Sequence, residues 1–89
     1  MAIVHLPRSL VILFNDPPPP RLDSDAATLL ALVDQLDAGW PGMRDRLCEP
    51  GPRFREHINV FVNGDRQTDM ATPLPADAVV HLIPAVAGG

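Results

Sequence analysis

Residues 58–89 decide the fold of this chain: they read INVFVNGDRQTDMATPLPADAVVHLIPAVAGG. The run Ile58–Val62 alternates its side chains with the period of two that a strand requires. Asn63-Gly64 follows, a dipeptide typical of a tight hairpin turn. A second β-branched run, Val79–Ile83, stops at Pro84, which has no N–H to donate to a sheet. The stretch therefore predicts two strands of one sheet, with room for a short strand after the turn.

The first quarter of the chain predicts a second pair of strands. Ala2–Leu6 is a β-branched apolar run that ends at a proline, as a strand would. The segment Asn15–Pro20 contains four consecutive prolines and must be a connection. Arg21–Asp23 is expected to return as the hairpin partner of the first strand. For Ser9–Phe14, periodicity leaves a strand and a packed turn both open.

The main helix is predicted from about Ala26 to Ala38. Its apolar residues recur at helical spacing: Leu29, Leu30, Leu32, Val33 and Leu36. Asp23-Ser24-Asp25 offers side chains suited to the N-cap, and Gly39 is the expected C-cap. Met43–Cys48 could add one further helical turn. Together the elements predict an α+β fold, in which a mixed sheet of four to five strands packs on one main helix.

Length and composition limit the class of protein. Eighty-nine residues suffice for one small domain, which we expect over 1–83, followed by a flexible tail over 84–89 that ends in Gly-Gly. The net charge of −4 disfavours binding to nucleic acid. The longest apolar run, Leu10–Phe14, is too short to cross a membrane, and no signal peptide is evident. With a single cysteine, Cys48, the composition indicates a cytoplasmic protein.

Several motifs together resemble the MoaD/ThiS family of sulfur carrier proteins, which have the ubiquitin-like β-grasp fold. Within this family, the chain resembles the subgroup that includes cysteine-biosynthetic sulfur carriers and molybdopterin-synthase-like small subunits. It covers nearly the whole chain and departs from the family at Leu10–Pro20. The motifs are Val4-His5-Leu6-Pro7, Ala27-Thr28-Leu29, Trp40-Pro41-Gly42 with Arg44 and Leu47, Asn59–Gly64, Thr72-Pro73-Leu74, Asp77 and Leu82–Gly89.

The resemblance implies that this chain is a covalent carrier and not an enzyme. An E1-like adenylyltransferase/sulfurtransferase would use ATP to adenylate the carboxylate of Gly89, and a sulfur nucleophile would then displace AMP to leave a thiocarboxylate. The carrier would hold no permanent cofactor. It would donate its sulfur to a biosynthetic enzyme that makes cysteine, a cofactor or a specialised metabolite. Gly88, Ala87 and Val86 would thread the tail into the partner's active site, for which small side chains are suited.

A docking face is predicted from the alternation of the two strands. If Ile58, Val60, Val62, Val80 and Leu82 face the helix, then Phe61, His81 and Ile83 face outward. Exposed aromatic and aliphatic side chains on neighbouring strands are typical of a partner surface, although they also occur on ordinary surfaces. The resemblance implies the same, because ubiquitin-like domains meet their activating enzymes through this face.

Other functions stay open on the sequence. The chain could be the small subunit of molybdopterin synthase, a ubiquitin-like protein modifier or a passive binding module. We expect no catalytic residue, because the aspartates on and before the helix are suited to capping and to solvent. We expect no metal, since the three histidines lack ligand spacing and Cys48 is expected to pack in the core.

Overall fold

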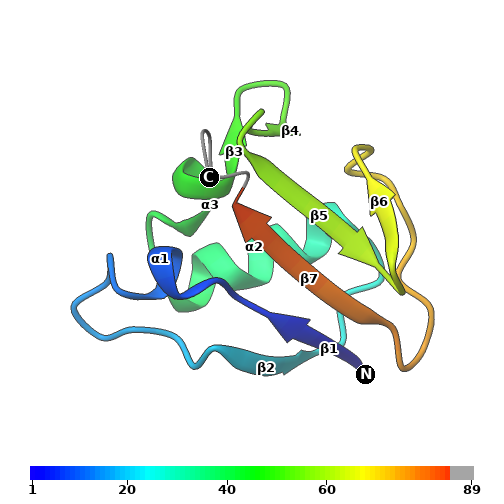
Figure 1. Ribbon diagram of the computed structural model, residues 1–89, viewed down its shortest axis with the longest axis horizontal. Coiled ribbons are helices and arrows are strands. Elements are labelled where there is room, and N and C mark those ends of the chain that lie inside the picture. The colour runs from blue at the N-terminus through cyan, green and yellow to red at the C-terminus, as the bar shows by residue number, and fades with distance from the viewer. Residues whose placement is uncertain (85–89) are drawn as a thin grey trace.

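The computed structural model describes residues 1–84 and contains one mixed sheet that covers one main helix. The strand order is β2-β1-β7-β5-β6. The strands β1 and β7 run parallel, and the other neighbours are antiparallel. In Figure 1 the sheet lies toward the viewer and the main helix α2 passes behind it. The strands are β1 (Ala2–His5), β2 (Arg21–Ser24), β5 (Ile58–Val62), β6 (Asp65–Gln67) and β7 (Val79–Pro84).

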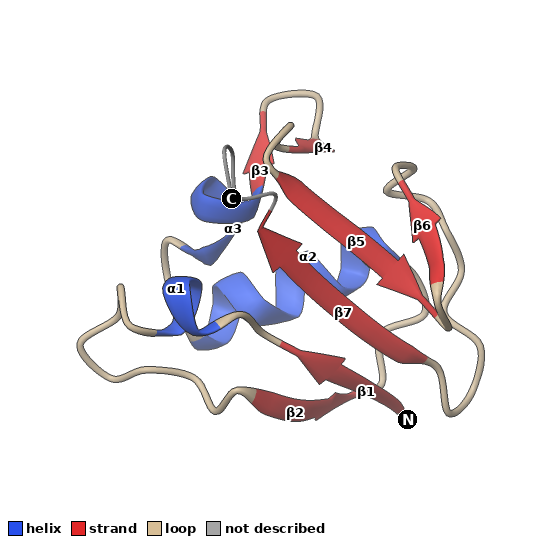
Figure 2. Ribbon diagram, viewed as in Figure 1, coloured by secondary structure: helices blue, strands red, loops and turns tan. Residues whose placement is uncertain are grey.

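The remaining elements lie around this sheet (Figure 2). They are α1 (Arg8–Val11), α2 (Leu29–Gly39), α3 (Met43–Leu47) and a small hairpin of β3 (Cys48–Glu49) with β4 (Arg53–Phe54). The predicted α+β fold, with a mixed sheet on one main helix, is confirmed. The stretch that we left open, Ser9–Phe14, contains most of α1, which is a single helical turn.

The core forms between α2 and the inner face of the sheet. Along β5 and β7, the five side chains predicted to face the helix are all buried, and Val80 and Val60 are at most 1% exposed. From α2, four apolar residues that are at most 2% exposed meet them: Leu29, Leu32, Val33 and Leu36. Burial of these side chains supplies the main driving force for folding, at roughly 25 cal/mol per Å² of apolar surface.

The start of α2 differs from the prediction. Its N-cap is Thr28, whose hydroxyl accepts a hydrogen bond from the N–H of Ala31 at 3.1 Å. The expected cap segment Asp23-Ser24-Asp25 is wrong, because Ser24 is the last residue of β2 and pairs with Ala2. The carbonyl of Ala27 also bonds outside the helix, because it accepts a hydrogen bond from the N–H of Leu74 at 2.8 Å. The helix therefore begins about one turn later than predicted, because the preceding residues are paired with the sheet.

The end of α2 is also displaced by one residue. Gly39 is the last helical residue, and the C-cap is Trp40, whose N–H donates to the carbonyl of Leu36 at 2.8 Å. Between α2 and α3, the glycine with a left-handed conformation is Gly42, with φ of 101°. The turn chemistry that we assigned to Gly39 is therefore wrong and belongs three residues later.

The predicted hairpin turn is confirmed and has a second function in the fold. Asn63 and Gly64 both have positive φ, 52° and 86°, as a tight hairpin turn between twisted strands requires. The side-chain oxygen of Asn63 accepts from the N–H of Val79 at 2.9 Å, and its own N–H donates to the Val79 carbonyl at 2.8 Å. One asparagine thus ties the turn to the start of β7. At the other end, Pro84 is the last residue of β7 and lies opposite Ile58.

Candidate functional site

The strand β7 leads in sequence to the C-terminal segment that the resemblance implies is adenylated and threaded into a partner. Its predicted site residues, Gly89 for adenylation and Val86, Ala87 and Gly88 for threading, lie outside the described residues. The described chain reaches Pro84, at the end of a central strand of the sheet. The sheet itself carries the other part of the predicted site, the docking face Phe61, His81 and Ile83.

The predicted docking residues do lie together on the solvent side of the sheet. Phe61 of β5 is directly opposite His81 of β7, and Ile83 follows two residues later on the same face. Ile83 is 44% exposed, an unusual value for an isoleucine in a central strand. The alternation of buried and accessible residues along both strands agrees with this placement. The role of these residues in docking stays a prediction.

The sheet register extends this face into a row that crosses all five strands. Residues that are directly opposite one another share a face of the sheet. His81 has His5 of β1 on its other side, His5 is opposite Arg21 of β2, and Phe61 is opposite Arg66 of β6. Sequence reasoning missed these three residues. The alternation of buried Ala2, Val4 and Leu6 could have indicated the direction of His5, but the neighbour on each side depends on strand order.

His5 and His81 stack face to face at the centre of the row. Their ring centroids are 4.4 Å apart and the rings are tilted by 6°. Burial, followed by the charges of His81 and Arg21, lowers the pKa of His5 below its ordinary value. His5 is therefore neutral at pH 7 in the free protein, since an ordinary histidine already titrates near pH 6.5.

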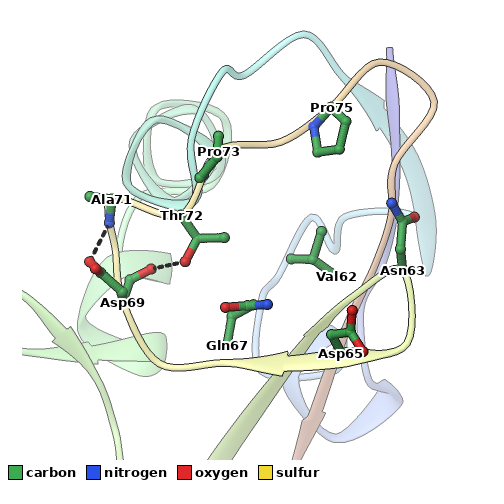
Figure 3. Close-up of a pocket in the computed structure, with 9 residues that line it drawn as sticks. All are labelled: Val62, Asn63, Asp65, Gln67, Asp69, Ala71, Thr72, Pro73 and Pro75. Carbon is green, nitrogen blue, oxygen red and sulfur yellow. Dashed lines mark hydrogen bonds between the residues drawn. The ribbon is translucent and has the colours of Figure 1, made fainter.

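A pocket of about 540 Å³ lies on another part of the molecule, between β6 and the segment that leads to β7 (Figure 3). Its polar groups include Asp65, Gln67 and Asp69. Asp69 is engaged in its own loop, where its carboxylate accepts from the N–H of Ala71 at 2.8 Å and its carbonyl accepts from the Thr72 hydroxyl at 2.7 Å. Among residues 1–84, no group of three metal-ligating side chains is found.

A smaller pocket of about 220 Å³ lies where β7 ends. Its lining includes Leu10 and Leu13 of the α1 region, His57, and Pro84. Leu13 and the neighbouring Ile12 are 51% and 67% exposed. These apolar side chains come from the segment 10–20, where the sequence predicted a departure from the family pattern.

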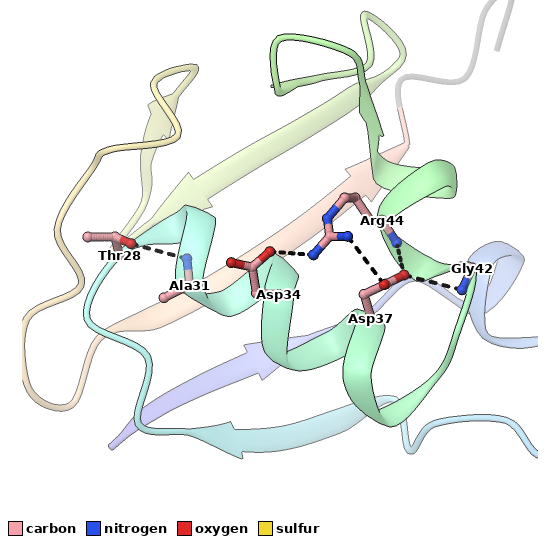
Figure 4. A network of polar contacts seen from close by, with 6 residues as sticks. All are labelled: Thr28, Ala31, Asp34, Asp37, Gly42 and Arg44. Carbon is pink, nitrogen blue, oxygen red and sulfur yellow. Dashed lines mark hydrogen bonds and ion pairs between the residues drawn. The ribbon is translucent and has the colours of Figure 1, made fainter.

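The acidic residues of α2 have structural partners (Figure 4). Asp37 accepts hydrogen bonds from the N–H groups of Arg44 and Gly42 at 3.0 and 3.2 Å. The Arg44 guanidinium forms ion pairs with both Asp37 and Asp34. The N–H of Arg44 makes the largest contribution to lowering the pKa of Asp37. These carboxylates fasten α3 to α2, and they form no acid–base pair.

Cys48 is a core residue. It is 4% exposed at the end of α3, and burial raises the pKa of its thiol to about 11. A thiol with this pKa is almost entirely protonated at neutral pH and is a poor nucleophile. Among the described residues, no helix is both long enough and apolar enough to cross a membrane.

The chain matches proteins that carry sulfur. The model of the ThiS family matches residues 12–89. The sulfur carrier protein CysO of Mycobacterium tuberculosis is 33% identical over 67 aligned residues, and the match covers 70% of this chain and 72% of the relative.

Solved structures share the same fold. A chain of the BexX/CysO complex of Amycolatopsis orientalis superposes with a TM-score of 0.85 at 23% identity, with all of both chains covered. SAMP1 from Haloferax volcanii gives a TM-score of 0.72 at 26% identity, with 99% of this chain and 98% of that chain covered. The first of these likenesses, at its low identity, speaks for the fold alone.

Proposed function

This chain belongs to the ThiS family and is a sulfur carrier protein, and from this membership we propose that the carboxylate of Gly89 is the group that carries the sulfur. As a member of the family it is a substrate of an E1-like enzyme and not itself a catalyst. The observation that supports Gly89 is the family match, which extends to residue 89. The motif that resembles the family, Leu82–Gly89, begins within β7.

The proposed chemistry has two steps at the carboxyl group of Gly89. The Gly89 carboxylate attacks the α-phosphorus of ATP, pyrophosphate leaves, and an acyl adenylate forms. Hydrosulfide then attacks the carbonyl carbon and displaces AMP, and loss of the S–H proton leaves the thiocarboxylate. A free carboxylate is a poor electrophile, so adenylation supplies the leaving group that the second step needs. Both steps take place in the activating enzyme, where ATP is consumed.

The tail must reach that enzyme's active site from the end of β7. An extended residue spans about 3.3–3.6 Å, so residues 85–89 can reach roughly 17 Å beyond Pro84. We propose that the domain predicted over 1–83, which the structure extends by Pro84 of β7, is docked, and that the remainder of the predicted 84–89 tail is flexible and is threaded. Gly88 has no Cβ, and Ala87 and Val86 are small enough for a narrow channel.

The docking face supports the same scheme from the folded part of the chain. Phe61, His81 and Ile83 lie on the solvent side of the strands β5 and β7, and β7 continues into the tail. An enzyme that contacts this face while the tail enters its active site would hold the carrier at two places. We propose a cytoplasmic location, because activation consumes ATP.

The proposed recipient of the sulfur is a biosynthetic enzyme. The CysO of Amycolatopsis orientalis is found in a complex with BexX, so a protein of this fold can bind a second protein. The likeness to SAMP1 from Haloferax volcanii keeps a ubiquitin-like modifier as the second candidate function. A modifier would end in an isopeptide bond from Gly89 to a lysine of another protein, whereas a carrier would release its sulfur and return to the carboxylate.

Deletion of Gly89 tests the proposal. The truncated chain should unfold at the same temperature as the full chain, because the described core is built from residues between Ala2 and Leu82. It should no longer be thiocarboxylated by the activating enzyme with ATP and a sulfur source, as followed by intact mass. As a control, Ala76→Gly removes a methyl group from an exposed residue in the loop before β7 and should leave the reaction unchanged. Normal thiocarboxylation of the truncated chain would contradict the proposal.

A further inference from the structure

We propose that the outer face of the sheet is a cationic docking surface that receives carboxylates of the activating enzyme, with the stacked His5 and His81 at its centre. This inference rests on the proposed function and adds the chemistry of the partner's surface. The outer face is defined by the ten residues whose side chains point away from α2. They are Ile3, His5, Arg21, Asp23, Asn59, Phe61, Arg66, Val79, His81 and Ile83.

The cations of this face are evenly placed. Arg21 and Arg66 stand at the two ends of the five-strand row, on the edge strands β2 and β6, and both are exposed. The two imidazoles and Phe61 occupy the three positions between them. Because neighbouring strands are about 4.8 Å apart, the backbone positions of Arg21 and Arg66 are separated by roughly 19 Å across the sheet. The row thus offers an apolar and imidazole centre between two positive ends.

The charge of the outer face is opposite to that of the rest of the molecule. Its charged residues are Arg21, Arg66 and Asp23, which give the face +1 with neutral histidines. The whole chain carries −4, so the remainder carries −5. Protonation of His5 would raise the face to +2. Charge complementarity with such a face steers a partner and sets its orientation, and the complement here is a set of carboxylates.

The stacked pair gives this surface a dependence on pH. The groups that face His5 are His81 of β7, Arg21 of β2 and, two residues farther along β2, Asp23 opposite Ile3. His81 in turn has Phe61 of β5 beside it, with Arg66 of β6 beyond. The neighbouring cation and the second ring both oppose a positive charge on His5. A carboxylate placed over the pair would favour that charge, so docking should be accompanied by uptake of a proton.

The favoured partner is a protein and not a nucleic acid. A polyanion such as RNA extends past a patch of this size and would meet the −5 carried by the rest of the chain. A few carboxylates fixed on a folded surface can match the row without that repulsion. We assign them to the activating enzyme, because adenylation is the first step that brings Gly89 into another protein, and β7 carries both His81 and the start of the tail.

Charge reversal at the two ends tests the surface. Arg21→Glu and Arg66→Glu should each raise the KM of the carrier for the activating enzyme by about fivefold at low salt, with kcat unchanged. The increase should shrink at high salt, because exposed charges are screened. The matched control is Arg53→Glu, which makes the same change of charge on the separate β3–β4 hairpin. Equal KM values for all three variants would overturn the proposal.

The histidines are tested by a pH profile. For the wild type, KM should fall as the pH is lowered from 8 to 6, since protonation favours docking. His5→Gln and His81→Gln should flatten this dependence, whereas His57→Gln, which lies outside the outer face, should retain it and so corrects for the pH dependence of the enzyme itself. A profile that all three variants share would overturn the role of the pair.

The two proposals fail in distinguishable ways. If the wild-type chain is not thiocarboxylated at all, the proposed function fails. If the wild type reacts and the outer-face variants react as their controls do, the docking surface alone is wrong. Competition of the reaction by short RNA, lost in Arg21→Glu and Arg66→Glu, would also contradict a carboxylate partner.

Discussion

Single residues owe their chemistry in this protein to their positions in the fold. Cys48 is the clearest case, because its side chain is almost fully buried and burial raises the pKa of the thiol to about 11. At pH 8 only about one thiol in a thousand would then be ionised, and the thiolate is the reactive form.

We therefore expect Cys48 to resist modification in the native protein. At pH 8, a thiol-specific reagent should react with it far more slowly than with free cysteine, and unfolding in guanidinium should expose one reactive thiol per chain. The measurement is the absorbance of the released reporter with time. Rapid stoichiometric reaction of the native protein would show that Cys48 is accessible and would contradict its place in the core.

Asp37 should contribute stability that depends on pH. Its pKa is lowered in the folded state, chiefly by the N–H of Arg44 and further by the N–H of Gly42 and the Arg44 charge. A lowered folded pKa means that the stabilisation is present above the unfolded pKa and is lost as the pH falls through the folded value. Asp37→Ala should therefore unfold at a lower urea concentration at pH 7, and the difference from wild type should fade below about pH 4.

A matched variant separates this contact from the charge itself. Asp16→Ala removes the same charge from an exposed loop and should change the urea midpoint little at either pH. If Asp37→Ala and Asp16→Ala behave alike at pH 7, the contact between α2 and α3 does not stabilise the fold.

Some residues of the outer face could be predicted from the sequence, and others could not. Phe61, His81 and Ile83 could be assigned to the solvent side because alternation within a strand is a local property. His5, Arg21 and Arg66 could not be added, because their place in the row depends on which strands are neighbours. That information is carried by pairings between segments far apart in the chain, such as His5 with His81.

At the scale of elements, strands and the helix were predictable, and their boundaries less so. Ile58–Val62 was predicted with the bounds that β5 has, because period-two alternation marks both ends of the run. The N-terminus of α2 was misplaced, because Asp23, Ser24 and Asp25 are as suitable for an N-cap as Thr28. The pairing of β2 with β1 and the bridge from Thr28 to Pro73 decide between them, and both are tertiary contacts.

Thr28→Ala tests the assignment of the N-cap. Loss of the hydroxyl that accepts from the Ala31 N–H should lower the free energy of unfolding by about 1 kcal/mol. For a domain of this size, that corresponds to a fall in Tm of roughly 4–8 °C. Thr28→Ser keeps the hydroxyl and should recover most of the loss, and Thr68→Ala after β6 should change little. The same Tm for Thr28→Ala and Thr68→Ala would contradict the cap.

Neither α1 nor the β3–β4 hairpin could be predicted from the periodicity of apolar residues in the sequence. Four residues of helix give too short an apolar period to recognise, and strands of two residues have no alternation. Both elements exist because the surrounding core holds them: Leu10 of α1 and Cys48 of β3 are buried in it.

At the scale of the whole molecule, the parallel pairing of β1 with β7 determines how the fold serves the proposed function. It places the first and last strands side by side in the interior of the sheet, where β7 is held on both sides. The chain therefore enters the tail from a rigid strand that also carries His81 and Ile83. A partner that docks on the outer face receives a tail whose origin at Pro84 is fixed relative to that face.

The central claim is that Gly89 carries sulfur, and intact-mass analysis tests it most directly. The full chain is incubated with ATP, a sulfur source and an E1-like enzyme of the same organism, and its mass is compared with that of a sample lacking ATP. Exchange of one carboxylate oxygen for sulfur adds about 16 Da, close to the mass of one methionine oxidation, so fragment ions must assign the change. We expect an ATP-dependent increase that maps to Gly89. No increase with an enzyme that is active on another carrier, or an increase that maps to Met1, Met43 or Met70, would contradict the account.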